Sequence, residues 1–249
     1  MRRERPLMRL KVIGCEALLR ETCRFAARSE HVIDLEFFDF GLHNDPAAMR
    51  VDVQRRIGAS EGEAYDAIIL VAGLCGNGSA GLTAGGIPLV LPRADDCIVL
   101  LLGSRESYDS DHGANPGTYY LTPGFLERAN QNDDGIGQEA RRRIHLHYVE
   151  RYGQDNADYL MSVLHSWQGN YSRACFIDSG AASPRRLAQF REQARAIAGP
   201  YGWQYDELSA DTRMLRDLFD GHWTEEDFLV VPPGHRIEPS NDSRVLTIA

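Results

Sequence analysis

The chain has 249 residues, of which 43% are hydrophobic and 25% charged, and its formal net charge is −9. This composition is ordinary for a soluble globular protein, and the length suits one large α/β domain or two smaller halves. The negative charge argues against a nucleic-acid partner, which needs clustered cations, and no apolar stretch approaches the roughly 20 residues that span a bilayer. We therefore expect neither a nucleic-acid-binding protein nor a membrane protein.

The N-terminal segment MRRERPLM is basic and leads into a predicted strand, not into a signal-peptide core with a cleavage site. We therefore expect a cytoplasmic protein. In that compartment thiols stay reduced, so packing, nucleophilic catalysis and metal binding are the roles open to the five cysteines. These are Cys15, Cys23, Cys75, Cys97 and Cys175.

Strand-like and helix-like segments alternate through the first hundred residues. The run YDAIILVAGLC is continuously apolar, which is typical of a strand buried on both faces of a parallel sheet. Shorter strand patterns lie on either side of it, with helical patterns between them. The alternation predicts an α/β fold with a mostly parallel open sheet. The predicted strands of this part lie within residues 8–15, 31–43, 65–75 and 87–97.

The middle of the chain has a different composition. Residues 104–137 are rich in Gly, Pro, Asn and Asp, which predicts a long functional loop or a mobile lid. Residues 138–171 then show a helical pattern. The sequence predicts a domain division into 1–137, carrying the cysteine loops and the lid, and 138–249, carrying the helical connection and a second α/β half.

The last third repeats the order of the first. RACFIDSG, WQYDEL and DFLVVPPGHRI read as strands, and helical patterns separate them. This order suggests a weak internal duplication, with two βαβαβ halves around a central cleft. Any doubly wound fold also alternates in this way, so both interpretations remain open at this point.

Three cysteines share one kind of position. Cys15 ends the first predicted strand, Cys75 lies in the loop after the third, and Cys97 lies just beyond the fourth. Ligands of open parallel sheets bind outside the carboxyl ends of the strands, so these thiols can converge. Three thiolates suit a [4Fe–4S] cluster with one open iron, or a Zn²⁺ ion with an open fourth position. We expect plain packing for Cys23 and Cys175.

The residues around these cysteines supply further candidates. Gly76 and Gly78 allow close approach of a cluster to the backbone, and with Ser104 they form the predicted cofactor-binding set. Arg93 and Arg105 are predicted to orient a substrate. The same arginines can lower the pKa of a reactive Cys75, so a cysteine nucleophile stays an alternative. A dinucleotide loop in GLCGNGSAG is only weakly indicated by its glycine spacing.

The stretches AIILVAGLCGNGSAGL, PLVLPRADDCIVLLLGSRESY and NPGTYYLTPGF resemble a family of cytoplasmic bacterial and archaeal proteins with a domain of unknown function. GCEALLRE and DFLVVPPGHRI extend the resemblance over almost the whole chain. It implies that the three cysteines recur, and that some members are encoded near corrinoid-dependent methyltransferases. The resemblance implies a histidine where this chain has Asp95, so a ligand or base role of that histidine is altered or lost here. Asp95 itself is one of the predicted catalytic residues.

Together these patterns predict a cytoplasmic metal-dependent enzyme, a transferase or a lyase. Its three cysteines would hold an iron–sulfur cluster, or alternatively Zn²⁺, which acts as a Lewis acid on a small polar substrate. The resemblance implies a role in one-carbon or methylamine-type metabolism. The alternative is an accessory protein that holds a corrinoid, a metal or a metabolite for a methyltransferase partner. A cysteine-dependent hydrolase or transferase is the second alternative.

Overall fold

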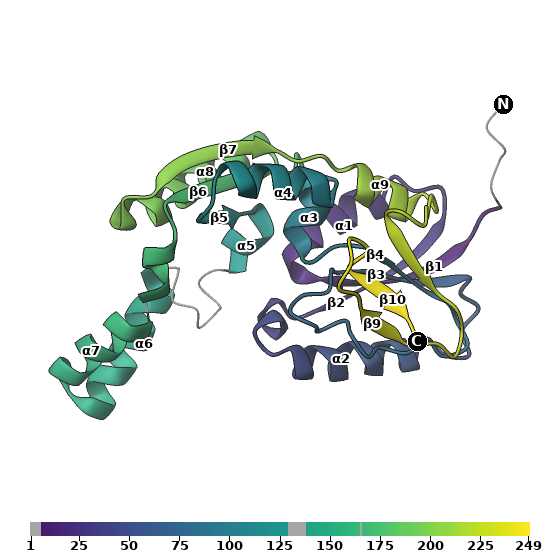
Figure 1. Cartoon of the computed structure of the whole chain (residues 1–249), viewed down its shortest axis with the longest axis horizontal. Coiled ribbons are helices and arrows are strands. Elements are labelled where there is room, and N and C mark those ends of the chain that lie inside the picture. Colours follow the sequence, from purple (N-terminus) through teal and green to yellow (C-terminus); the bar gives the residue numbers. More distant parts are fainter. Residues whose placement is uncertain (1–5, 129–137, 165) are drawn as a thin grey trace. The chain divides into compact units, whose positions relative to one another are not determined.

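Residues 6–128, 138–164 and 166–249 are described by the computed structural model (Figure 1). They divide into two units, and each is described by itself. The first unit combines Met1–Tyr108 with Asp211–Ala249, and the second is Asp109–Ala210. No helix in these described ranges is long and apolar enough to cross a membrane.

The first unit is built on a five-stranded sheet with the order β2-β1-β3-β4-β8. The first four strands run parallel and β8 pairs antiparallel with β4, so the predicted fold class, α/β with a mostly parallel open sheet, is confirmed. Every residue of β3 is buried, as its continuous apolar run predicts. The strands are β1 (Arg9–Cys15), β2 (Val32–Phe38), β3 (Ala67–Val71), β4 (Leu89–Pro92) and β8 (Phe228–Val231).

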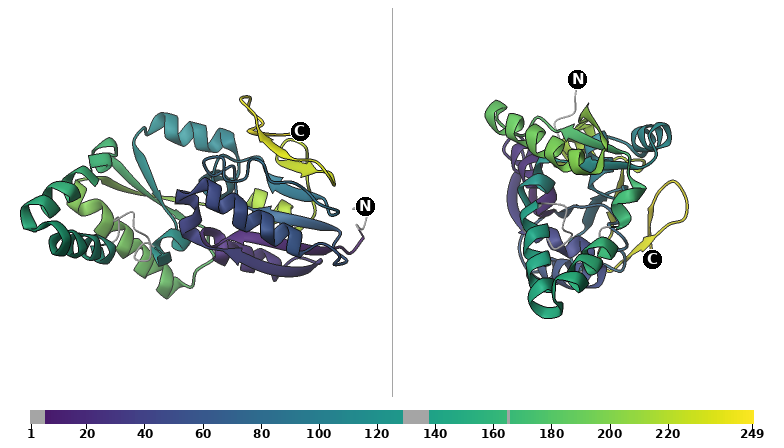
Figure 2. Two further views of the ribbon diagram at one scale, coloured as in Figure 1. Left: turned by 90° about the horizontal axis from the view of Figure 1, so that it is seen from below. Right: turned by 90° about the vertical axis from the view of Figure 1, so that its left-hand side faces the viewer.

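The helices of the first unit cover both faces of this sheet. The strand order reverses at β1, because β2 lies on one side of it and β3 on the other. Right-handed crossovers therefore place the helices after β1 and β2 on opposite faces, which Figures 1 and 2 show. The elements are η1 (Glu16–Leu18), α1 (Leu19–Ala26), η2 (Phe40–Asn44), α2 (Pro46–Ala59), α3 (Cys97–Leu102) and α9 (Arg213–Phe219), with the hairpin β9 (Ile237–Pro239) and β10 (Leu246–Ile248).

Local sequence explains where α2 begins and which face it buries. Asp45 is the N-cap, and its side chain accepts a hydrogen bond from the Ala48 backbone N–H, while Pro46 occupies the first turn. Met49, Val53 and Ile57 are the buried residues of the helix. Their spacing of four puts them on one stripe, which packs into the core.

The second unit contains a smaller sheet in which all three strands are parallel, in the order β5-β6-β7. Its core is rich in aromatic rings, with Phe176, Phe190 and Trp203 buried at its centre. The elements are β5 (Thr118–Leu121), α5 (Pro123–Arg128), α6 (Gln138–Tyr152), α7 (Gln154–Leu164), η3 (Ser166–Asn170), β6 (Arg173–Asp178), α8 (Pro184–Ala198), η4 (Gly199–Tyr201) and β7 (Gln204–Ser209).

The predicted lid is largely regular structure. Residues 105–128 form α4 (Arg105–Ala114), β5 and α5, and residues 129–137 lie outside the described residues. The composition was misleading because α4 is polar all round and has no buried residue, so it lacks the apolar stripe that identifies a helix in a sequence. The expectation of a long loop over the described part of this segment is therefore wrong.

The last predicted strand, in DFLVVPPGHRI, does not lie in the sheet where the suggested duplication would put it. The strand in DFLVVPPGHRI, β8, pairs antiparallel with β4 in the sheet of the first unit. A third parallel strand of a second βαβαβ half would pair with β6 or β7 instead. The two compact units meet near residues 108 and 210 along the chain, whereas the sequence predicted a division at 137.

The division into units predicts where two core truncations act. Phe228→Ala empties a fully packed position in the first unit, and Phe190→Ala does the same in the second; both side chains are buried. Each change is expected to cost about 3–5 kcal/mol. Hydrogen exchange should show faster exchange of β3 amides in Phe228→Ala and of β6 amides in Phe190→Ala. If Phe228→Ala accelerated exchange in β6 and not in β3, the assignment of β8 would be contradicted.

Candidate functional site

Three cysteines reach the same edge of the first sheet. Cys15 is the last residue of β1, Cys75 lies in the loop that follows β3, and Cys97 is the first residue of α3, which follows β4. Because β1, β3 and β4 are adjacent and parallel, their carboxyl ends lie side by side. The edge between β1 and β3 is also where the strand order reverses, which is the usual ligand position in this class of sheet.

The thiols at this edge influence one another electrostatically. Burial raises the pKa of Cys97 well above its ordinary value, and the charges of Asp96, Cys75 and Cys15 raise it further. Burial, Cys15 and Asp96 raise the pKa of Cys75 to about 12, against a smaller lowering by a backbone hydrogen bond from Gly73. The neighbouring charges that raise both pKa values are those of Asp96 and the other thiols. Both thiols are therefore protonated at neutral pH.

The sulfur atoms are not arranged as a coordination shell. Within the described ranges, no three His, Cys, Asp or Glu side chains form a group placed to hold a metal ion. None of the five cysteines, all of which lie in the described ranges, is placed in a disulfide. The Cys15 sulfur accepts a hydrogen bond of 3.4 Å from the Ala17 backbone N–H and so caps η1. Cys15 is buried, while Cys75 and Cys97 are partly exposed.

The loop that carries Cys75 has an unusual backbone. Cys75 has φ = 48° and Asn77 has φ = 73°, values that side chains with a Cβ atom rarely adopt. Such a conformation costs about 1–3 kcal/mol at each residue and is often retained where function requires it. Arg50 of α2 helps to hold the loop, because its Nη2 donates to the Asn77 carbonyl at 3.0 Å.

The two predicted cofactor-binding glycines have different surroundings. A Cβ atom at Gly76 would meet only the Pro46 ring, at 3.8 Å, so this side of Cys75 has free space. A Cβ atom at Gly78 would lie 2.5 Å from the Met49 sulfur. Gly78 therefore makes room for the protein's own side chain, and the structure gives a cofactor no space there.

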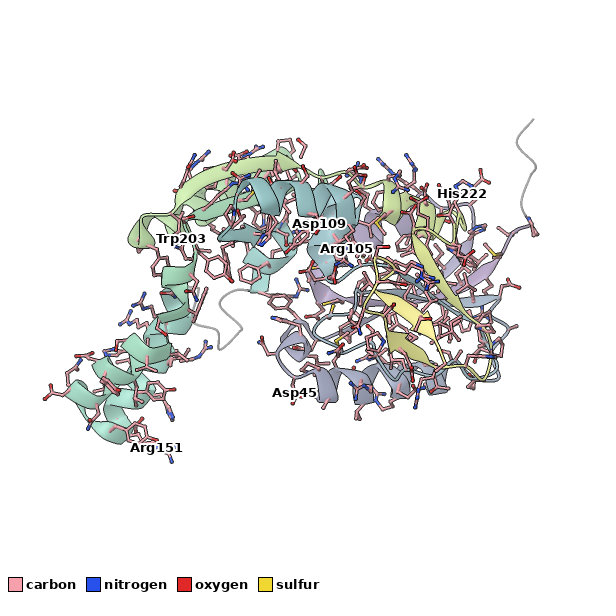
Figure 3. All side chains as sticks on the ribbon, in the orientation of Figure 1. Asp45, Arg105, Asp109, Arg151, Trp203 and His222 are labelled. Carbon is pink, nitrogen blue, oxygen red and sulfur yellow. The ribbon has the colours of Figure 1, made fainter. Side chains whose placement is uncertain are left out.

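Asp95 and Arg105 lie together beside the Cys75 loop. Arg105 Nη1 and Asp95 Oδ2 are 3.6 Å apart in a partly exposed ion pair, and the Asp95 carbonyl accepts a hydrogen bond of 2.8 Å from the Cys75 backbone N–H. Figure 3 labels Arg105 at the start of α4. Ser104 precedes it, and its hydroxyl oxygen accepts a 3.0 Å hydrogen bond from the Ser107 backbone N–H. Ser104 thus has a capping role in α4.

Arg93 serves the fold. Its side chain is buried, and its guanidinium donates to the backbone carbonyls of Glu225, Phe228, Arg244 and Leu246. These carbonyls belong to the C-terminal segment of the first unit. The structure gives Arg93 this role in holding the C-terminal segment, while Arg105 pairs with Asp95 beside the Cys75 loop.

Sequence reasoning did not assign Asp96 to the site. Its Oδ1 accepts hydrogen bonds from the Ile98 and Val99 backbone N–H groups at 2.8 and 3.3 Å, so it is the N-cap of α3. Burial raises the pKa of its carboxyl group, and hydrogen bonds from the helix lower it in part. An acidic residue directly before an apolar helical run is a capping signal, and it was available in the sequence.

The fold is that of an α/β protein in which three cysteines lie at the carboxyl edge of a mostly parallel sheet. Residues 37–219 match the model of the family DUF1638, described as a protein of unknown function, and the chain belongs to that family. The match includes Cys75 and Cys97, whereas Cys15 precedes it. A comparison with curated proteins gives no match.

The two arginines offer a direct test of their different roles. Arg93→Lys replaces the guanidinium, which donates to several backbone carbonyls at once, by an ammonium group that cannot reach all of them. It should lower the free energy of unfolding by about 2–4 kcal/mol. Arg105→Lys changes a partly exposed ion pair and should change it by less than about 1 kcal/mol. Urea unfolding of both variants measures the difference. Equal stability of the two variants would contradict the structural role of Arg93.

The charge of Asp96 predicts a change in thiol reactivity. Asp96→Asn keeps a capping side chain but removes a negative charge that raises the pKa of Cys75 and Cys97. The pKa of both thiols should fall, so more thiolate is present at pH 8 and alkylation by iodoacetamide should be faster. Mass spectrometry with EDTA present gives the rate at each cysteine. An unchanged rate at both would show that Asp96 does not act on them.

Proposed function

We propose that the protein is a metal-dependent enzyme in which Cys15, Cys75 and Cys97 hold a thiolate-bound metal centre at the carboxyl edge of the first sheet. The observation that carries the proposal is that three thiols whose charges act on one another follow the carboxyl ends of adjacent parallel strands. Burial and mutual repulsion make three thiolates unfavourable there. A bound cation would remove that repulsion, so the arrangement favours metal binding coupled to loss of the thiol protons.

The same electrostatics weigh against a cysteine nucleophile. A reactive thiol needs a lowered pKa from a nearby cation or an adjacent base. The pKa of Cys75 is instead raised to about 12, and its neighbours Cys15 and Asp96 raise it. Packing alone is also a poor account of Cys75, because its φ of 48° carries strain that a packing role does not require.

The donor set suits a soft metal. Thiolates select Zn²⁺ or iron–sulfur clusters over Mg²⁺ and Ca²⁺. We favour a [4Fe–4S] cluster, because three protein ligands and the free space beside Gly76 fit a bulky group with one position open to substrate. Zn²⁺ is the alternative metal. When bound, such a centre supplies a Lewis acid that polarises the substrate.

We assign the handling of the substrate to Arg105 and Asp95. Their ion pair is partly exposed and lies next to the Cys75 loop, so an anionic group of a small polar substrate can compete with the Asp95 carboxylate for the guanidinium. Asp95 in turn can accept a proton from the substrate. This use of the pair requires no rearrangement of buried structure.

The cellular setting is part of the proposal. Five free thiols suit the reducing cytoplasm, where we place the protein. The sequence resemblance supports a role in one-carbon or methylamine-type metabolism, with a corrinoid protein or methyltransferase as the partner. An accessory role, in which the chain holds a corrinoid or metal without turnover, would give cofactor binding with no catalysis.

The proposal is tested by metal and sulfide analysis after anaerobic purification. We expect either iron with acid-labile sulfide and broad visible absorption, or about one Zn²⁺ per chain. Cys15→Ala, Cys75→Ala and Cys97→Ala should each lose most of the bound metal.

Cys23→Ala is the matched control, because Cys23 is exposed and lies on α1 outside the three-thiol edge. It should keep the wild-type metal content. A folded wild-type protein that takes up neither iron with sulfide nor Zn²⁺ would refute the proposal. Loss of metal from Cys23→Ala equal to that of the three site variants would refute the choice of ligands.

A further inference from the structure

The segments that carry Cys75 and Cys97 are joined by backbone hydrogen bonds beyond the ends of their strands. The Leu74 N–H donates to the Ala94 carbonyl and the Cys75 N–H to the Asp95 carbonyl, both at 2.8 Å. Residues 74–75 therefore contact residues 94–95 directly, beyond the paired residues of β3 and β4. The Cys75 N–H itself makes the second of these hydrogen bonds, to Asp95. Cys97 lies two residues after Asp95 in the sequence. The relative position of the two cysteines therefore depends on how closely the segments approach.

Gly73 sits at the closest point of that approach. A Cβ atom at Gly73 would lie 2.8 Å from the Ala94 carbonyl oxygen and from the Asp96 nitrogen, and 2.9 Å from the Asp96 Cα. All three are backbone atoms, so no flexible side chain can move aside. Any residue other than glycine must push the two segments apart.

Gly73 also makes hydrogen bonds to two residues of its own loop, Ser79 and Cys75. The Ser79 hydroxyl, which is buried, donates to the Gly73 carbonyl at 2.6 Å. A backbone hydrogen bond from Gly73 to Cys75 stabilises the thiolate form. One residue therefore contacts the Cys97 segment, the Cys75 thiol and the end of its own loop.

We propose that Gly73 is a positioning residue that sets the separation of Cys75 and Cys97, so that these two thiols act as a pair toward a thiophilic ligand. Its consequence for a metal rests on the proposed function, whereas the pairing itself does not. In the proposed centre, Cys75 and Cys97 form the fixed part of the site. Cys15, which caps η1 through its sulfur, joins them by giving up that hydrogen bond.

Phenylarsine oxide tests the pairing without any metal. Its As=O group condenses with two thiols, forming two As–S bonds and releasing one water that takes up both thiol protons, while arsenic stays trivalent. The test uses the full chain in the Cys15→Ala background, so that Cys75 and Cys97 are the pair. Adding Gly73→Ala should weaken binding of the arsenical by about tenfold or more. The added Cβ pushes the two segments apart, so arsenic bonded to one thiol no longer reaches the second.

Two further variants serve as controls for that result. Cys97→Ala in the same background gives the one-thiol baseline. Gly86→Ala changes the same connection between β3 and β4, but its added Cβ meets only the flexible Glu61 carboxylate, at 3.0 Å, so it should keep paired binding. If Gly73→Ala bound the arsenical as tightly as its parent, the positioning role would be refuted. The same holds if Gly86→Ala lost as much binding as Gly73→Ala.

A measurement on the unaltered chain covers the case in which Gly73→Ala does not fold. The Leu74 and Cys75 amides should exchange slowly with solvent, because both are bonded to the neighbouring segment. Rapid exchange at both would refute the fixed separation. Paired arsenical binding in a protein that takes up no metal would refute the metal centre and leave the role of Gly73 intact.

Discussion

The parallel alignment of β1, β3 and β4 is the constraint on which the rest of this site depends. Parallel strands end at the same edge, so residues 15, 75 and 97 meet there although they are far apart in the sequence. Burial and the charge of Asp96 raise the pKa of Cys75 and of Cys97 at this edge. The proposed metal centre would offset that cost when the thiol protons are lost.

Several polar side chains near the carboxyl edge of the first sheet hold the backbone in place and are not available to a substrate. Arg93 holds the C-terminal segment through its backbone carbonyls, and Asp96 caps α3. Gly73 and Gly78 provide room for neighbouring protein atoms. The proposed ligand contacts use the thiols, the open side of Gly76 and the partly exposed ion pair of Arg105 and Asp95.

The sequence predicted the elements whose signals are local and strong. The apolar run of β3 and the Asp45–Pro46 start of α2 are examples, because burial on both faces and helix capping leave clear patterns. The positions of the three cysteines at strand ends followed from the same patterns. The helix α4 was missed because a helix that is polar on every side has no periodic apolar signal.

Other features depend on contacts that no local pattern contains. Glycines around Cys75 look alike in the sequence, but Gly76 has free space beside it and Gly78 has the Met49 sulfur. Arg93 looked like a site residue because it precedes Cys97, yet its partners lie more than 130 residues further along the chain. The antiparallel pairing of β8 with β4 is equally non-local, so an apparent repeat in the sequence led to the wrong sheet for that strand.

The central claim, a metal held by three cysteine thiolates, is tested most directly by X-ray absorption at the metal edge of the anaerobically purified protein. We predict sulfur ligands at about 2.3 Å, with a reduced sulfur contribution in Cys75→Ala. A metal coordinated by nitrogen and oxygen alone, or a spectrum that Cys75→Ala leaves unchanged, would contradict this account.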